Sequence, residues 1–169
     1  MKRLLMILLS LAMVLNCILP AAVYAEGGIS QEGRICTRLG ILKGHTGTVD
    51  AAYLETKPTR LQAAIMFLRL KGLEQQALDY RGKANFADAG LVAWKQGQNV
   101  LCYLKEHPEL GWIGDGNYFR PSELIDTKAY HKVLLETLGY KQIIDGAGDF
   151  SWNSVLDYAE GKGFKKAVR

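Results

Sequence analysis

The sequence is poor in the residues that make disulfide-rich or metal-stabilised folds. Its 169 residues include three cysteines and three histidines. Only Cys36 and Cys102 lie beyond the first 25 residues, and two cysteines are too few for a disulfide framework. No C-x-x-C pair occurs, and the histidines have no metal-ligand spacing with each other or with the cysteines. We therefore expect two buried thiols, no metal site and no cofactor.

An excess of charge of one sign is also absent. The chain has 21 basic and 17 acidic residues, a formal net charge of +4, which falls to +2 without the first 25 residues. This charge is too small to indicate nucleic acid or an anionic membrane surface as a partner. The C-terminal cluster of Lys162, Lys165, Lys166 and Arg169 is more typical of a solvated helix end.

The first 25 residues have the pattern of an export signal. Lys2 and Arg3 form a basic start, residues 4–19 are apolar almost throughout, and residues 23–25 suit a cleavage site. The apolar run is shorter than the roughly 20 residues that span a membrane, and Pro20 follows it. We expect residues 1–25 to be a signal peptide, with no stable membrane insertion after cleavage. Lipidation at a cysteine of this segment is the weaker alternative.

A sequence pattern occurs twice, about 70 residues apart. A Leu-Gly turn at residues 39–44 is followed by Pro-Thr-Arg-Leu-Gln at 58–62, and a Leu-Gly turn at 110–114 is followed by Asp-Thr-Lys-Ala at 126–129. Such a repeat indicates that the chain is built from similar units.

Each repeated Thr is expected to begin an amphipathic helix. After Thr59, four apolar residues at i, i+3, i+4 and i+7 form one stripe, and Gly72 marks the end. A similar apolar stripe follows Thr127, and Gly139 marks the expected end of that helix. The residues expected to be buried in these two helices are Ile65, Leu68, Val133, Leu134 and Leu138.

A further helix is expected before each of these two, over residues 30–42 and 90–106, and no segment shows sustained strand alternation. We therefore predict an all-α fold of helix-loop-helix units packed as one helical bundle. Its units are residues 30–84, residues 85–145 and an incomplete third unit at 146–169. Because the third unit lacks its second helix, we expect the apolar side of its first helix to lack a cover.

The start of each repeated helix combines a cap with a cation. Thr59 and Gln62 have the spacing of a capping box, and Asp126 is an alternative cap beside Thr127. Arg60 and Lys128 are unfavourable there, because a cation in the first turn opposes the helix dipole. A bound anion would explain them, since backbone amides, a hydroxyl and a basic side chain converge on one oxyanion. Pairing with a nearby carboxylate, or exposure to solvent, is the alternative.

These features resemble S-layer homology domains, the repeats by which exported bacterial proteins attach to the cell wall. The resemblance extends from about Ser30 onward. It rests on the two Leu-Gly turns, the Thr-basic helix starts, Phe86-Ala87-Asp88 and the Gly-Asp-Gly-Asn-Tyr-Phe-Arg-Pro run at 114–121. It implies non-covalent binding of an anionic secondary cell wall polysaccharide held beside peptidoglycan. The ligand contacts it implies are Thr59, Arg60, Trp112, Thr127 and Lys128.

The leading hypothesis is therefore a wall-binding module without catalytic residues, located at the cell wall or in an S-layer. A structural or assembly protein that contacts itself or other surface proteins is the alternative. A wall-glycan enzyme is less favoured, because its candidate carboxylates, Asp115, Glu123 and Asp126, lie where acids are common in turns.

The export signal predicts a defined mature N-terminus. We expect the extracellular protein to begin at Glu26 and to carry no lipid, because residues 23–25 suit cleavage and the bulky Asn16 before Cys17 disfavours lipidation. N-terminal sequencing and intact mass measurement of the secreted protein will test this. A retained leader, or a diacylglyceryl mass on Cys17, would contradict it.

Overall fold

The structure is a computed structural model that describes residues 28–44, 47–143 and 145–164, so the expected signal peptide and Cys17 lie outside the described residues. The chain divides into two compact units. One spans Gly33–Ile125, and the other combines Met1–Glu32 with Asp126–Arg169. These boundaries differ from those of the three expected repeats, which stay a prediction.

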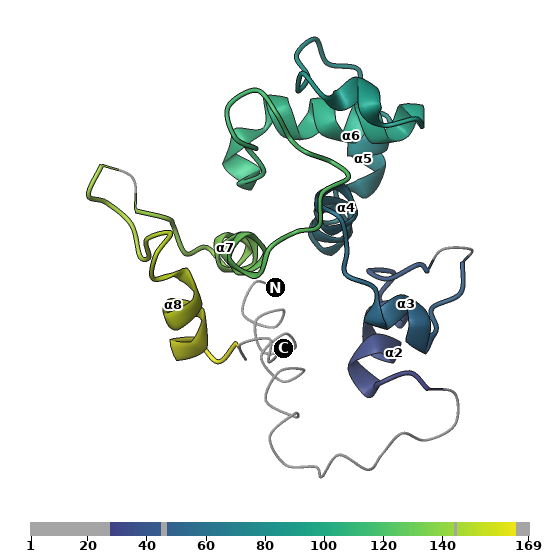
Figure 1. Cartoon of the computed structure of the whole chain (residues 1–169), viewed down its shortest axis with the longest axis horizontal. Helices are drawn as coiled ribbons and strands as arrows, with labels where there is room; N and C mark the ends of the chain where they lie inside the picture. The colour runs from purple at the N-terminus through teal and green to yellow at the C-terminus, as the bar shows by residue number, and fades with distance from the viewer. Residues whose placement is uncertain (1–27, 45–46, 144, 165–169) are drawn as a thin grey trace. The chain divides into compact units, whose positions relative to one another are not determined.

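The described part of the chain is mostly helical, as predicted (Figure 1). Isolated bridges, but no strands, occur within it. Its α-helices are α2 (Gln31–Arg38), α3 (Ala51–Glu55), α4 (Arg60–Lys71), α5 (Glu74–Leu78), α6 (Lys95–Glu106), α7 (Thr127–Thr137) and α8 (Val155–Gly161). Two 3₁₀ turns, η2 (Ala89–Leu91) and η3 (Pro108–Leu110), flank α6.

Helix α4 has the ends that the sequence predicts. The Thr59 hydroxyl accepts a hydrogen bond from the Gln62 backbone N–H at 3.3 Å, and the Gln62 side chain accepts one from the Thr59 N–H at 2.8 Å. Gly72 ends the helix in the left-handed region, at φ +71°. The capping box is therefore confirmed.

Helix α7 begins at the predicted place but with a different cap. Asp126 is the N-cap, and its carboxylate accepts the Ala129 N–H at 2.8 Å. Thr127 is the first helical residue. A carboxylate at this position also interacts favourably with the helix dipole, so the second copy begins one residue earlier than the first.

Three details of the helices differ from the sequence prediction. The short helices α3 and α5 were not predicted. The expected helix over residues 90–106 is interrupted, because Val92 and Trp94 have extended backbone angles and α6 begins only at Lys95. Helices of five residues are too short for the spacing of apolar residues to reveal them, although Asp50 caps α3 through the Tyr53 N–H.

The core of the unit Gly33–Ile125 lies between α4, α5 and α6. Ile65 and Leu68 of α4 are buried, as predicted. Further side chains that are completely buried come from α6 and from the segment after it: Val100, Leu101, Leu104 and Phe119.

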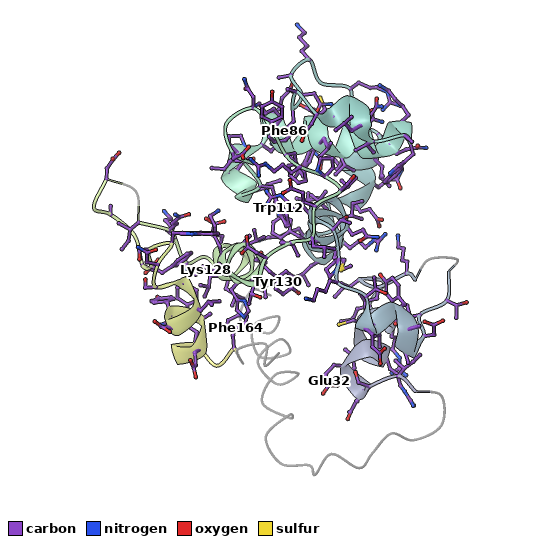
Figure 2. All side chains as sticks on the ribbon, viewed as in Figure 1. Glu32, Phe86, Trp112, Lys128, Tyr130 and Phe164 are labelled. Atoms are coloured by element: carbon purple, nitrogen blue, oxygen red, sulfur yellow. The ribbon has the colours of Figure 1, made fainter. Side chains whose placement is uncertain are left out.

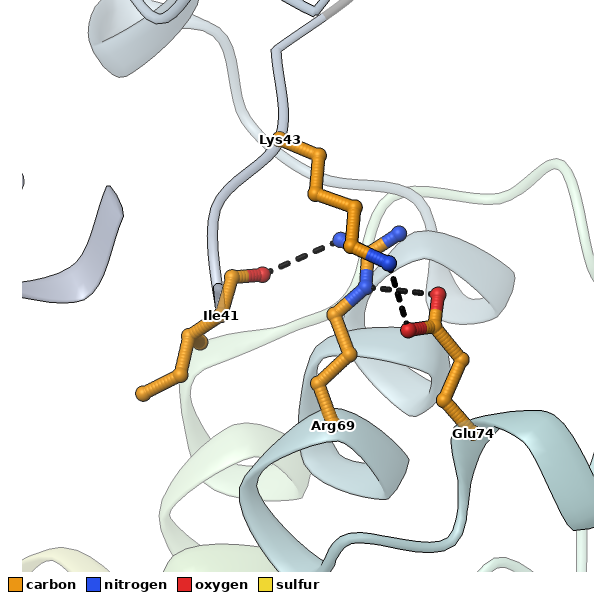
Figure 3. A network of polar contacts seen from close by, with 4 residues as sticks. All are labelled: Ile41, Lys43, Arg69 and Glu74. Carbon is orange, nitrogen blue, oxygen red and sulfur yellow. Dashed lines mark hydrogen bonds and ion pairs between the residues drawn. The ribbon is translucent and has the colours of Figure 1, made fainter. Parts of the chain in front are cut away.

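A charged network joins the segment before α3 to α4 and α5 (Figure 3). Glu74 accepts hydrogen bonds from Lys43 at 2.6 Å and Arg69 at 2.8 Å, and Arg69 also donates to the Ile41 carbonyl at 3.0 Å. Burial of the Glu74 carboxyl acts to raise its pKa, but the bonds from Lys43 and Arg69 outweigh burial and hold the pKa below its ordinary value.

In the second unit, α7 and α8 pack on each other around a core of aromatic and aliphatic side chains. The buried cluster is Leu135, Phe150, Val155, Ala159 and Phe164. The expectation that the last helix lacks a cover is therefore wrong, because α7 provides that cover. Val133 is buried as predicted, but Leu134 and Leu138 are only half-buried at the edge of the cluster.

The core assignment predicts unequal costs for two leucine truncations. Leu68→Ala should lower the free energy of unfolding by about 2–5 kcal/mol, because it removes a fully buried side chain and leaves a cavity. Leu91→Ala, at a side chain that is 77% exposed, should change it by less than about 0.5 kcal/mol. Denaturant unfolding of both variants checks this. Equal costs would contradict the assignment.

Candidate functional site

The first turn of α4 has no backbone amides available for an anion. The Arg60 N–H donates to the Glu123 carbonyl at 2.8 Å and the Leu61 N–H to the Pro121 carbonyl at 3.2 Å. The Gln62 N–H bonds to the Thr59 cap. The backbone amides of the oxyanion site that we considered at this helix start are therefore already bonded within the chain.

The Arg60 side chain also has partners inside the protein. Its Nε donates to the Phe119 carbonyl at 2.8 Å, and its guanidinium carbon lies 5.3 Å from the centre of the Phe119 ring. From the sequence we considered a carboxylate partner or exposure to solvent for Arg60, and the partner is neither of these. A charged hydrogen bond and a cation–π contact explain why a cation is stable at this helix start.

The segment that receives these bonds is itself held by a buried carboxylate. Asp88 is 9% exposed and accepts the backbone N–H of Phe119 at 3.0 Å and of Arg120 at 2.6 Å. Arg120 has φ +59° and pairs with the carboxylates of Asp115 and Glu123. Two of the carboxylates considered for glycan hydrolysis, Asp115 and Glu123, thus contact this arginine. The Phe-Ala-Asp motif has a structural role through Asp88, which the sequence did not reveal.

Trp112 lies in the core, although we expected it to contact a ligand. Its side chain, labelled in Figure 2, is 3% exposed. It packs near Phe67 and Phe119, with ring centres 5.9 and 6.1 Å away. Within the described part of the chain, its buried indole N–H has no hydrogen-bond partner. An aromatic residue after a Leu-Gly turn therefore serves packing here.

The start of α7 presents its cation differently. The Lys128 ammonium lies 6.0 Å from the centre of the Trp152 ring, which is 41% exposed (Figure 2 labels Lys128). Among the described residues Lys128 makes no ion pair. Thr127 is half-buried, and its carbonyl bonds to Nδ1 of the buried His131 at 2.7 Å. Of the expected contacts, Lys128 is the one beside an accessible aromatic face.

Trp152 was not recognised from the sequence as a site residue. The available signal was the similarity between Asn85-Phe86-Ala87-Asp88 and Asp149-Phe150-Ser151-Trp152. In both copies the Phe is buried. The fourth residue differs in role, since Asp88 binds backbone amides whereas Trp152 lies at the surface.

A second cluster of ionisable groups lies at the end of α6. Glu106 accepts the backbone N–H groups of Ala84 and Lys83 and the Tyr80 hydroxyl, at 2.7, 2.7 and 2.6 Å. These bonds lower the pKa of Glu106, and the bond to Glu106 raises the pKa of Tyr80 to about 12. Burial raises the pKa of the neighbouring Cys102 thiol. The cluster fixes the loop after α5 and holds no activated nucleophile.

Cys102 is buried as expected, and Cys36 is half-buried. In the described ranges no group of His, Cys, Asp and Glu side chains is arranged to hold a metal ion. No helix among these residues has both the length and the hydropathy needed to cross a bilayer. Comparison with protein-family models, curated proteins and solved structures finds no match to this chain.

The geometry at α4 predicts that Arg60 stabilises the fold. Arg60→Ala should lower the free energy of unfolding by about 1–3 kcal/mol, because a charged hydrogen bond to the Phe119 carbonyl is lost. Lys57→Ala, at an exposed neighbouring cation, should change it by less than about 0.5 kcal/mol. Chemical denaturation measures both. A stable Arg60→Ala variant that binds walls poorly would instead identify Arg60 as a ligand contact.

Proposed function

We propose that this chain is an exported module that binds an anionic secondary cell wall polysaccharide, without covalent linkage, beside peptidoglycan. The observation that carries the proposal is the Lys128 ammonium lying over the partly exposed Trp152 ring at the second Thr-basic helix start. A pyranose packs its apolar face on an aromatic ring, and an ammonium attracts the carboxylate of an acidic sugar. Both kinds of group are therefore presented together.

The proposal includes the repeat architecture and the location. We infer that the two Thr-basic helices belong to two S-layer-homology-like repeats, that a partial third repeat follows, and that all of them pack as one helical bundle. The signal peptide then directs the protein to the cell surface. The similar cap positions of α4 and α7 support the repeats, since both helices begin within one residue of the repeated Thr.

A structural or assembly role at the cell surface is the second candidate. It is favoured by exposed apolar side chains around η2, where Leu91 and Trp94 lie close together in sequence at the surface. Exposed apolar side chains of this size mark protein contacts when they form a contiguous patch.

Wall fractions distinguish the two candidates. The mature protein is mixed with purified walls, with walls stripped of their non-peptidoglycan polymer, and with that polymer alone. A polysaccharide-binding module sediments with intact walls and not with stripped walls, and it loses binding as salt rises, because the attraction is ionic. Sedimentation that is independent of the polymer would contradict the proposal.

Variants of the second unit test the residues involved. Lys128→Ala and Trp152→Leu should each weaken binding to intact walls about 3- to 30-fold, through loss of a charged contact and of an aromatic face. Lys141→Ala is the matched control, an exposed lysine of the same unit, and should change affinity less than twofold. Equal binding by all three variants would place the polysaccharide site elsewhere on the chain.

A further inference from the structure

The chain contains two Asp-Gly bonds, Asp115-Gly116 and Asp145-Gly146. An Asp-Gly bond can rearrange without an enzyme, because glycine has no side chain to shield its backbone nitrogen from the aspartate carboxyl group. Both bonds lie in turns, and Gly116 and Gly146 have φ of +72° and +83°. The same dipeptide therefore occurs in two structural settings, which differ in the contacts that hold the aspartate.

Asp115 is held in place by its neighbours. Its N–H donates to the Tyr118 carbonyl at 3.0 Å, and its carboxylate forms an ion pair with Arg120. The carbonyl of the following Gly116 accepts a hydrogen bond from the Lys105 ammonium at 3.1 Å. To bring its carboxyl carbon against the Gly116 nitrogen, Asp115 has to give up the ion pair and shift this turn.

No comparable contacts hold Asp145. Both Asp145 and Gly146 are exposed. Within residues 28–44, 47–143 and 145–164, no group bonds to the Asp145 carboxylate or to the Gly146 N–H. Asp145 has φ +53°, in a region that aspartate adopts more readily than most residues. Its side chain is therefore free to rotate towards the backbone nitrogen that follows it.

The loop that carries Asp145 lies between α7 and α8 and is closed by contacts that do not involve Asp145 (Figure 1). The Lys141 carbonyl accepts the Asp149 and Phe150 N–H groups at 2.7 and 3.3 Å, and the Ile143 N–H donates to the Phe150 carbonyl at 2.7 Å. Phe150 is 1% exposed, in the core formed by α7 and α8. Reaction at Asp145 therefore does not require this core to open.

We propose that Asp145 is a site of spontaneous isoaspartate formation in the folded protein and that Asp115 is not. The Gly146 nitrogen attacks Cγ of Asp145 and forms a C–N bond, and the carboxyl hydroxyl leaves with the amide proton as water. One water molecule then opens the resulting succinimide. When it breaks the bond between the nitrogen and the Asp145 carbonyl carbon, the main chain runs through Cβ and Cγ and an α-carboxylate remains.

The net reaction is an isomerisation, since one water leaves and one is added, and no oxidant or other reactant is required. The inference does not rest on the proposed function. It adds a modification site in the second unit, at an exposed loop.

The test compares the two sites in one sample. The mature protein is incubated in mildly acidic buffer at about body temperature, and isoaspartate is located by digestion and mass spectrometry that separates the two aspartate forms. The folded protein should carry at least about fivefold more isoaspartate at residue 145 than at residue 115, because reaction at Asp115 requires an ion pair and a turn to open. In concentrated urea the two sites should react to within about twofold, since both aspartates precede glycine.

Substitutions at each site check the chemistry. Asp145→Glu should remove the product at residue 145, because the longer side chain has to close a six-membered ring. Asp145→Asn should increase that product, with release of ammonia, because a neutral carboxamide is a better electrophile than a carboxylate. Asp115→Glu is the matched control and should leave the amount at residue 145 unchanged.

Equal isoaspartate at the two sites of the folded protein, or more at Asp115, would overturn the inference. A fivefold preference that persists in urea would also overturn it, since the selectivity would then come from the local sequence and not from the contacts of Asp115. A folded protein without product at Asp145, when the unfolded chain reacts there, would show that the loop holds an unreactive geometry and would refute the assignment.

Discussion

The start of α4 is the contact on which the larger unit depends. Three groups there donate hydrogen bonds to carbonyls of residues 119–123. They are the Arg60 N–H, the Leu61 N–H and the Arg60 guanidinium. The Pro58 carbonyl accepts from Ile125 just beyond them. A buried helix end requires such partners, and here they come from about 60 residues away. The α4 cap and the 119–125 segment therefore hold each other in place, and Asp88 holds the same segment through the Phe119 and Arg120 N–H groups.

The sequence predicts the parts of the fold that local chemistry decides. The limits of α4 follow from the capping box and Gly72, and both signals act within a few residues. Helix α3 also has a local cap, since Asp50 accepts the Tyr53 N–H at 2.7 Å, but its five residues are too few to form an apolar stripe. Helix α5 has no side-chain cap and packs on α6. The cover on α8 was also mispredicted, because the sequence pattern suggested a third unit with no second helix to cover it. Nothing in the pattern shows that α7 already occupies that face.

The sequence indicates where an explanation is needed at the helix starts but not what the explanation is. A cation in the first helical turn conflicts with the helix dipole, so Arg60 and Lys128 stand out as residues that need a partner. What resolves the conflict at Arg60 is a backbone carbonyl, and any residue type supplies one, so no sequence pattern indicates it. Trp112 shows the same limit of sequence analysis, because the sequence does not distinguish a buried tryptophan from an exposed one.

The two copies of the motif show how one sequence pattern can serve two purposes. At α4 the backbone amides, the cap and the cation all have partners within the chain. At α7 the cap is a carboxylate one residue earlier, and the cation lies against an accessible indole instead of a carbonyl. A cation bonded to a carbonyl in the interior is costly to redirect, since breaking that bond leaves a buried acceptor unsatisfied. A cation above an exposed ring loses little when an anion approaches, so the second copy is better suited to an acidic ligand.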